Sequence, residues 1–130
     1  MKFTAKILIC ILMLSSVLLA GCDTEDSDPK YNFKVMSSNG AFTGYYSVNG
    51  DSFKYFESAP VSGSSIYHSY EKSISSLDTI SIDVTAIDNT ATKITIYLYD
   101  DTDLLKRADV SQVDTETISL YLDYSTTSTE

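Results

Sequence analysis

From residue 31 onward, apolar and polar residues alternate with a period of two, the pattern of β-strands that bury one face. The alternation is most regular over residues 79–87 and 92–99. We expect the apolar positions of these stretches to form the centre of the core, namely Ile80, Ile82, Val84 and Ala86, and Ile94, Ile96 and Leu98. Shorter stretches of the same kind begin near residues 31, 42, 66, 104 and 118. No segment after residue 22 has the apolar period of an ordinary helix, so the sequence predicts an all-β domain.

The spacing of the two regular stretches restricts how they can pair. Residues that pair directly across a sheet share a face, and the inward positions of both stretches are even-numbered. A direct hairpin therefore needs a loop of odd length, for example 89–91, unless a bulge intervenes. Otherwise the two strands belong to opposite sheets. Both arrangements are compatible with a β-sandwich.

Asn49-Gly50 is a strong hairpin signal, because both residues tolerate the positive φ of a type I′ turn. If these two residues form the loop, the predicted cross-strand pairs are Val48 with Asp51, Tyr46 with Phe53, and Gly44 with Tyr55. This register places Phe42, Tyr46, Val48, Phe53 and Tyr55 on one face, and Tyr45 and Phe56 on the other with Thr43, Ser47, Ser52 and Lys54. It also lays the Tyr55 ring over Gly44, where an aromatic side chain can cover bare backbone.

Turn-forming residues separate the stretches at intervals of about 8 to 12 residues. They include the serine-rich segment 58–65 and the run Asp100-Asp101-Thr102-Asp103. About seven or eight short strands at this spacing favour a single antiparallel β-sandwich of the immunoglobulin-like type. We expect this domain to span residues 31–124 and to end in a frayed tail at 125–130.

The N-terminal 22 residues follow a different pattern. Two lysines precede an apolar run over 7–19 that only two serines interrupt. The run is shorter than the roughly 20 apolar residues of a membrane-spanning helix and has the form of a cleaved secretory signal. Its end, Leu19-Ala20-Gly21-Cys22, resembles the lipobox of bacterial lipoproteins. The resemblance implies removal of residues 1–21 and attachment of diacylglycerol to the Cys22 thiol, so that acyl chains, palmitate among them, anchor the protein to a membrane.

Residues 22–30 contain no apolar side chain after Cys22, and we expect them to form a disordered acidic tether. Asp23 resembles the inner-membrane retention signal of enteric bacteria. The acidic cluster that begins there is similar to the surface-export signal of Bacteroidetes lipoproteins. The resemblances agree on the bacterial cell envelope but imply different membranes, and a domain either in the periplasm or at the cell surface.

Charge and cysteine content narrow the classes of partner. All 18 Asp and Glu residues follow the expected cleavage point, together with seven of the nine Lys and Arg residues, so the cleaved chain would carry a side-chain net charge of −11. This charge argues against nucleic acid and anionic lipid headgroups as partners. Cys10 would leave with the signal and Cys22 would carry lipid, so we expect neither a disulfide nor a thiolate metal site.

Patterns that indicate catalysis or metal binding are sparse. His68 is the only histidine and no Gly-x-Ser-x-Gly motif accompanies it, so we expect a surface histidine, no enzyme and no cofactor. One histidine is also too few for a zinc site. Asp100, Asp101 and Asp103 are candidate calcium ligands, although their segment lacks the glycine and the distal glutamate of an EF-hand loop. Turn-forming aspartates are the alternative interpretation.

Two motifs in the domain, Tyr45-Tyr46-x-x-Asn49-Gly50 and Ile96-Tyr97-x-Tyr99-Asp100, resemble those of small bacterial sandwich lipoproteins. They are more distantly similar to the mycobacterial small membrane proteins that accompany lipid exporters, whose Pro-Trp pair and cysteines are missing here. This resemblance implies an accessory or structural subunit of an envelope complex.

The large number of tyrosines favours a second hypothesis, a surface module that binds a glycan or a protein. Because the neighbouring apolar residues are expected to point inward, Tyr97, Tyr99 and Tyr121 should point outward. These three residues are the candidate binding face, provided that the strand order makes them neighbours. An outward tyrosine offers a large contact area at a small cost in side-chain entropy.

Overall fold

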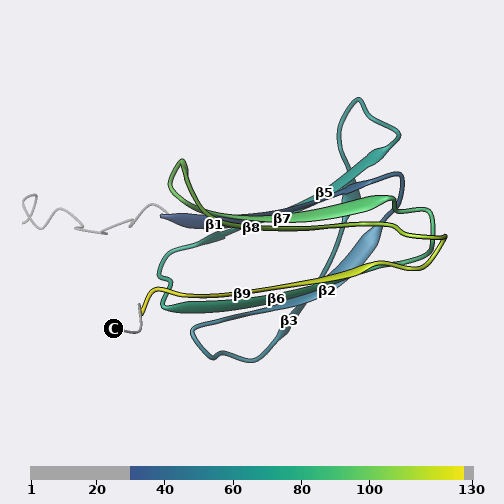
Figure 1. Cartoon of the computed structure of the whole chain (residues 1–130). Helices are drawn as coiled ribbons and strands as arrows, with labels where there is room; N and C mark the ends of the chain where they lie inside the picture. Colours follow the sequence, from purple (N-terminus) through teal and green to yellow (C-terminus); the bar gives the residue numbers. More distant parts are fainter. Residues whose placement is uncertain (1–29, 128–130) are drawn as a thin grey trace, which may run out of the picture.

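The computed structural model describes residues 30–127, which form two antiparallel β-sheets packed face to face (Figure 1). This arrangement confirms the predicted antiparallel β-sandwich. The expected signal peptide at 1–21, Cys22, the tether up to residue 29 and residues 128–130 lie outside the described residues. Within the described part, no helix is long and apolar enough to span a membrane.

Nine strands make up the two sheets of the described domain, more than the seven or eight predicted. The five-stranded sheet has the order β4-β5-β1-β7-β8. Its strands are β1 (Tyr31–Ser38), β4 (Ala59–Pro60), β5 (Tyr67–Ile74), β7 (Lys93–Asp100) and β8 (Asp103–Ser111). The four-stranded sheet has the order β3-β2-β6-β9. Its strands are β2 (Phe42–Val48), β3 (Lys54–Glu57), β6 (Thr79–Ala86) and β9 (Ser119–Ser125). The short β4 lies in the segment 58–65, which was predicted to be a loop throughout.

The inner faces of the two sheets enclose one apolar core. All seven residues predicted for its centre are at most 3% exposed: Ile80, Ile82, Val84, Ala86, Ile94, Ile96 and Leu98. β6 and β7 lie in different sheets, so the chain crosses from one sheet to the other between them. Of the two arrangements that the even-numbered spacing allowed, the one with opposite sheets is correct.

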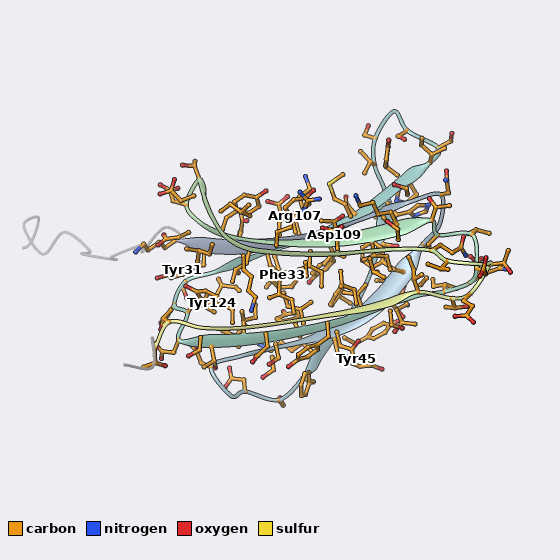
Figure 2. The ribbon with its side chains drawn as sticks, in the orientation of Figure 1. Tyr31, Phe33, Tyr45, Arg107, Asp109 and Tyr124 are labelled. Carbon is orange, nitrogen blue, oxygen red and sulfur yellow. The ribbon has the colours of Figure 1, made fainter. Side chains whose placement is uncertain are left out.

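Aromatic rings from both sheets pack against one another in the core. The Phe33 ring lies between the sheets (Figure 2), with its centroid 5.1 Å from that of Tyr46 and 6.0 Å from that of Phe56. Phe56 also stacks on Tyr70, with 4.4 Å between centroids and 23° between ring planes. Burial raises the pKa of the Tyr70 phenol, as expected for a hydroxyl withdrawn from water.

The predicted register of the β2–β3 hairpin is wrong by one residue. Asn49 and Gly50 do have positive φ, at 54° and 77°, and the Asp51 N–H donates to the Val48 carbonyl, as a two-residue turn requires. Pairing resumes only at Lys54, which lies opposite Tyr46, so Tyr45 faces Tyr55 and Gly44 faces Phe56. The faces of β3 are therefore reversed, with Phe56 buried and both Phe53 and Tyr55 exposed.

Two contacts explain this shift. The Asn49 side chain accepts hydrogen bonds from the N–H groups of Asp78 and Thr79 at 2.7 and 3.1 Å, which ties the turn to the start of β6 and not to a tight ladder with β3. On β3, the Phe56 ring covers Gly44 in place of the predicted Tyr55 ring. A Cβ atom on Gly44 would lie against that ring and 2.6 Å from the Asp83 carbonyl oxygen, so a bare glycine is required there.

Candidate functional site

The three tyrosines predicted to form a binding face lie on two different faces of the sandwich. Tyr97 and Tyr99 belong to β7 and point out from the five-stranded sheet, whereas Tyr121 belongs to β9 and points out from the four-stranded sheet. The outward direction follows from their buried neighbours on each strand. Strand order separates the three residues, so each outer face has to be considered by itself.

On the five-stranded sheet, a guanidinium group lies over one of the two tyrosines. Tyr97 and Tyr99 are stacked, with ring centroids 6.1 Å apart and 18° between planes, and both are half-buried. The Arg107 guanidinium lies 5.7 Å from the Tyr97 centroid, and its Nε is 3.3 Å from a carboxylate oxygen of Asp109. Lys93 approaches the same carboxylate at 4.0 Å. Figure 2 shows Arg107 and Asp109 together on this outer face.

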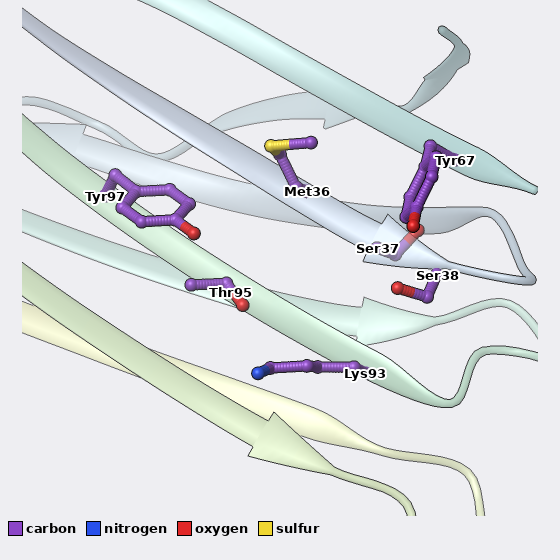
Figure 3. A pocket seen from close by; sticks show the side chains of 7 residues that line it. All are labelled: Met36, Ser37, Ser38, Tyr67, Lys93, Thr95 and Tyr97. Carbon is purple, nitrogen blue, oxygen red and sulfur yellow. The ribbon is translucent and has the colours of Figure 1, made fainter. Parts of the chain in front are cut away.

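A shallow hollow of about 180 Å³ lies on the same face, beside Tyr97. Figure 3 shows Tyr97 and Tyr67 on opposite sides of it, with Met36 between them, and the Lys93 and Thr95 side chains nearby. Pockets that enclose small molecules have volumes of about 300 to 1,000 Å³. The hollow is therefore a surface depression between strands, too small to enclose a ligand of ordinary size.

On the four-stranded sheet, a row of outward side chains crosses all four strands. Tyr45 pairs with Tyr55 on one side and with Asp83 on the other, and Asp83 pairs in turn with Tyr121. We call Tyr55, Tyr45, Asp83 and Tyr121 the tyrosine row. Its three tyrosines are 51 to 58% exposed, so their rings present most of their area to solvent. Figure 2 shows Tyr45 pointing away from the core on this side.

The rings of the tyrosine row are not coplanar. The Tyr45 and Tyr55 rings have centroids 5.4 Å apart and are tilted by 59°. The Tyr55 hydroxyl donates to the Glu57 carboxylate at 2.6 Å, and this hydrogen bond is the largest cause of the raised pKa of the Tyr55 phenol. Tyr45 and Tyr121 flank Asp83 from neighbouring strands, roughly 10 Å apart at two strand spacings.

Hydroxyl and carboxylate groups surround the tyrosine row. The other outward residues of the four strands are Thr43, Ser47, Glu57, Thr79, Ser81, Thr85, Ser119, Asp123 and Ser125. Ser81 donates to Asp123 at 3.0 Å, and the Thr85 and Ser119 hydroxyls are 3.1 Å apart. Within residues 30–127, this face carries three carboxylates and no lysine or arginine. It is an acidic, hydroxyl-rich surface with three exposed rings.

The sequence predicted only part of this row. Tyr121 and the outward direction of Tyr45 were expected, but Tyr55 was assigned to the inner face with the wrong hairpin register. The pairing of Asp83 with two tyrosines had no signal in the sequence, because it depends on β6 lying between β2 and β9. The alternation did place Asp83 on the outer face of β6.

A second hollow, of about 260 Å³, opens at the edge where β3 and β5 approach each other, and Lys54 and Lys72 line it. Both lysines point toward the core side of their strands, because they pair with the buried residues Tyr46 and Phe33. Inward-pointing charges on exposed strand edges prevent pairing with other chains. Lys54 lies on the edge strand β3, and Lys72 lies on β5 beyond the two residues that pair with β4, so both charges are placed where they disfavour pairing with other chains.

The remaining candidate residues lie apart from both tyrosine clusters. Asp100 and Asp103 pair across the β7–β8 turn, and the Asp100 carboxylate is 3.4 Å from the Lys30 ammonium. In the part of the chain that the structure describes, no three His, Cys, Asp or Glu side chains are placed to hold a metal ion. His68 is half-buried, with its Nδ1 atom out of contact with water, so the expectation of a simple surface histidine is not met.

Comparisons of the chain with protein-family models, curated proteins and solved structures find no match.

Proposed function

We propose that this protein is a lipid-anchored, non-catalytic accessory subunit of the bacterial cell envelope that binds its partner through the tyrosine row. The observation that carries the proposal is the exposure of three tyrosines in one cross-strand row on a single sheet face. Exposed tyrosines are typical anchors of binding surfaces. The lipobox-like Leu19-Ala20-Gly21-Cys22 supports the anchoring part of the proposal.

The geometry at the start of the domain is compatible with such an anchor. Lys30, the first described residue, lies beside the β7–β8 turn, where its carbonyl accepts a hydrogen bond from the Asp101 N–H. This is one end of the sandwich (Figure 1), and the strands run from it toward the opposite end. A lipid on Cys22 would hold this end nearest the membrane and leave the outer faces of both sheets accessible from the side.

Anchoring is tested by feeding labelled palmitate to cells that produce the full chain or its Cys22→Ser variant. The wild-type chain should incorporate label and be shortened by 21 residues, whereas Cys22→Ser should do neither. Equal labelling of the two chains would contradict the lipid anchor.

Binding is tested by placing a photo-crosslinking amino acid at position 121 or, as a control, at position 99 in the full chain in its host. Both positions are tyrosines on an outer sheet face. A discrete adduct from position 121 and none from position 99 would support the tyrosine row as the contact surface. Adducts from position 99 alone would assign binding to the five-stranded sheet and contradict the proposal.

A further inference from the structure

Two clusters in this domain show how its Tyr and Asp side chains hold a cation. Arg107 lies 5.7 Å from the Tyr97 ring centroid and 3.3 Å from the Asp109 carboxylate. Lys30 lies 5.3 Å from the Tyr31 ring centroid and 3.4 Å from the Asp100 carboxylate. In each case the positive charge contacts both an aromatic face and a carboxylate, two interactions that favour a cation at the same point.

The tyrosine row repeats this combination without a cation from the described chain. Asp83 lies between Tyr45 and Tyr121 in the sheet and is exposed, as are both rings. Lys34, Lys93 and Arg107 belong to the outer face of the five-stranded sheet, Lys30 pairs with Asp100, and Lys54 and Lys72 point toward the core side of their strands. Lys106 lies opposite the buried Leu98 and donates to the backbone carbonyl of Asp123 at the β9 edge, so it does not occupy the outer face of the four-stranded sheet. Glu57 and Asp123 add negative charge on the same face.

We propose that Tyr45, Asp83 and Tyr121 form a receptor site for an arginine side chain of a partner protein. This inference rests on the proposed function and specifies the partner as a protein with a basic contact surface. A guanidinium group can lie flat on a tyrosine ring while donating to the Asp83 carboxylate, whereas an ammonium group cannot stack in this way. The surrounding carboxylates attract a basic surface and repel an acidic one.

Ring geometry disfavours the alternative occupant, a glycan chain. A flat sugar chain needs several rings in one plane, but Tyr45 and Tyr55 are tilted by 59°. The Tyr55 hydroxyl is also engaged by Glu57 at 2.6 Å. Tyr45 has a tilted ring on one side and the Asp83 carboxylate on the other, an arrangement that suits a single cationic side chain better than an extended stacked chain.

The test uses the full mature protein, purified from membranes in an uncharged detergent, with ring-¹³C-labelled tyrosine. The chain has ten tyrosines and no tryptophan, so each ring can be followed by NMR. Hexaarginine is the probe, with hexalysine and a neutral glucose oligosaccharide for comparison. The expected result is that hexaarginine shifts the Tyr45 and Tyr121 resonances at lower concentration than hexalysine does, and that the oligosaccharide shifts neither.

Asp83→Asn and Asp109→Asn provide a matched pair, because each removes one carboxylate beside an outward tyrosine. Asp83→Asn should weaken hexaarginine binding by about fivefold, the loss of one exposed ion pair with its ring contact. Asp109→Asn should change the affinity for hexaarginine by less than about twofold, because the Asp109 carboxylate is already paired with Arg107. Equal losses in the two variants would show general attraction to an acidic protein and would overturn the inference.

The remaining outcomes separate this inference from the proposed function. Shifts of Tyr45 and Tyr121 with the oligosaccharide and not with hexaarginine would overturn the arginine site but leave the tyrosine row as a binding surface. If neither probe moves these rings, the arginine site is likewise overturned. In that case the crosslinking experiment at position 121 tests the proposed function separately.

Discussion

The two outer faces of the sandwich carry tyrosines in similar backbone settings but differ in how their charges are arranged. On the five-stranded sheet, Tyr97 and Tyr99 are half-buried, and Arg107 connects Tyr97 to Asp109. On the four-stranded sheet, Tyr45 and Tyr121 are more than half exposed beside Asp83, and no basic side chain of residues 30–127 lies on that face. On one face Arg107 and Lys93 form ion pairs with Asp109, whereas on the other Glu57 and Asp123 accept hydrogen bonds from hydroxyl groups and the described residues form no ion pair.

This difference leads to separate predictions for the two sets of tyrosines, one about stability and one about the proposed binding. A ring that stacks on another ring and lies under a guanidinium group has contacts to lose when it is removed. A ring that is mainly in contact with water contributes little to folding but can contribute much to an interface. We therefore propose that Tyr97 and Tyr99 belong to the scaffold and that the tyrosine row serves recognition.

The largest losses of stability are expected from substitutions in the core that the two sheets share. Ile82→Ala in the four-stranded sheet and Ile96→Ala in the five-stranded sheet should each lower the free energy of unfolding by about 2 to 5 kcal/mol, as fully buried large-to-small changes do. Chemical denaturation followed by circular dichroism measures both. A loss near zero at either position would mean that this sheet does not share the core.

A loss of stability of intermediate size should distinguish the two sets of tyrosines. The double variant Tyr97→Ser, Tyr99→Ser should lose about 1 to 3 kcal/mol, because it removes a stacked pair and the ring under Arg107. The double variant Tyr45→Ser, Tyr121→Ser should lose less than about 1 kcal/mol. Thermal unfolding of the two proteins under one condition checks this order, and the reverse order would exchange the assignment of scaffold and recognition surface.

The smallest changes in stability are expected from substitution of the two aspartates. Asp109→Asn should destabilise the protein by about 0.2 to 1 kcal/mol, because Lys93 and Arg107 lose an exposed partner. Asp83→Asn should be neutral or slightly stabilising, since it removes one negative charge from an acidic face that has no counterion in the described chain. Unfolding at low salt concentration enlarges the difference. Destabilisation by Asp83→Asn equal to that by Asp109→Asn would contradict the contrast between the faces.

Much of the fold was predictable, because alternation reports burial directly. The inward faces of β6 and β7 followed from Ile82, Ile96 and their neighbours, and their shared even numbering restricted the two strands to an odd loop, a bulge or opposite sheets. The β2–β3 register did not follow, because Asn49-Gly50 defines a turn but not where pairing resumes. That point depends on the contacts of Asn49 with Asp78 and Thr79, which are distant in the sequence.

The candidate site was less predictable than the fold. Its residues lie on separate strands, and only the order β3-β2-β6-β9 brings them together. The sequence correctly pointed Tyr121 outward but grouped it with Tyr97, from which the sheet order separates it. The local pattern predicts on which face of a strand a residue lies. Its neighbours on other strands are determined by the packing of the whole domain.

The most direct test of the central claim is chemical footprinting of the tyrosines by nitration, read by mass spectrometry in the purified protein and in intact envelopes. In the purified protein, Tyr45 and Tyr121 should react faster than Tyr97 and Tyr99, because their rings are more exposed. In intact envelopes, Tyr45 and Tyr121 should become protected while Tyr97 and Tyr99 keep their rates. Unchanged rates at Tyr45 and Tyr121, with new protection at Tyr97 and Tyr99, would contradict the account.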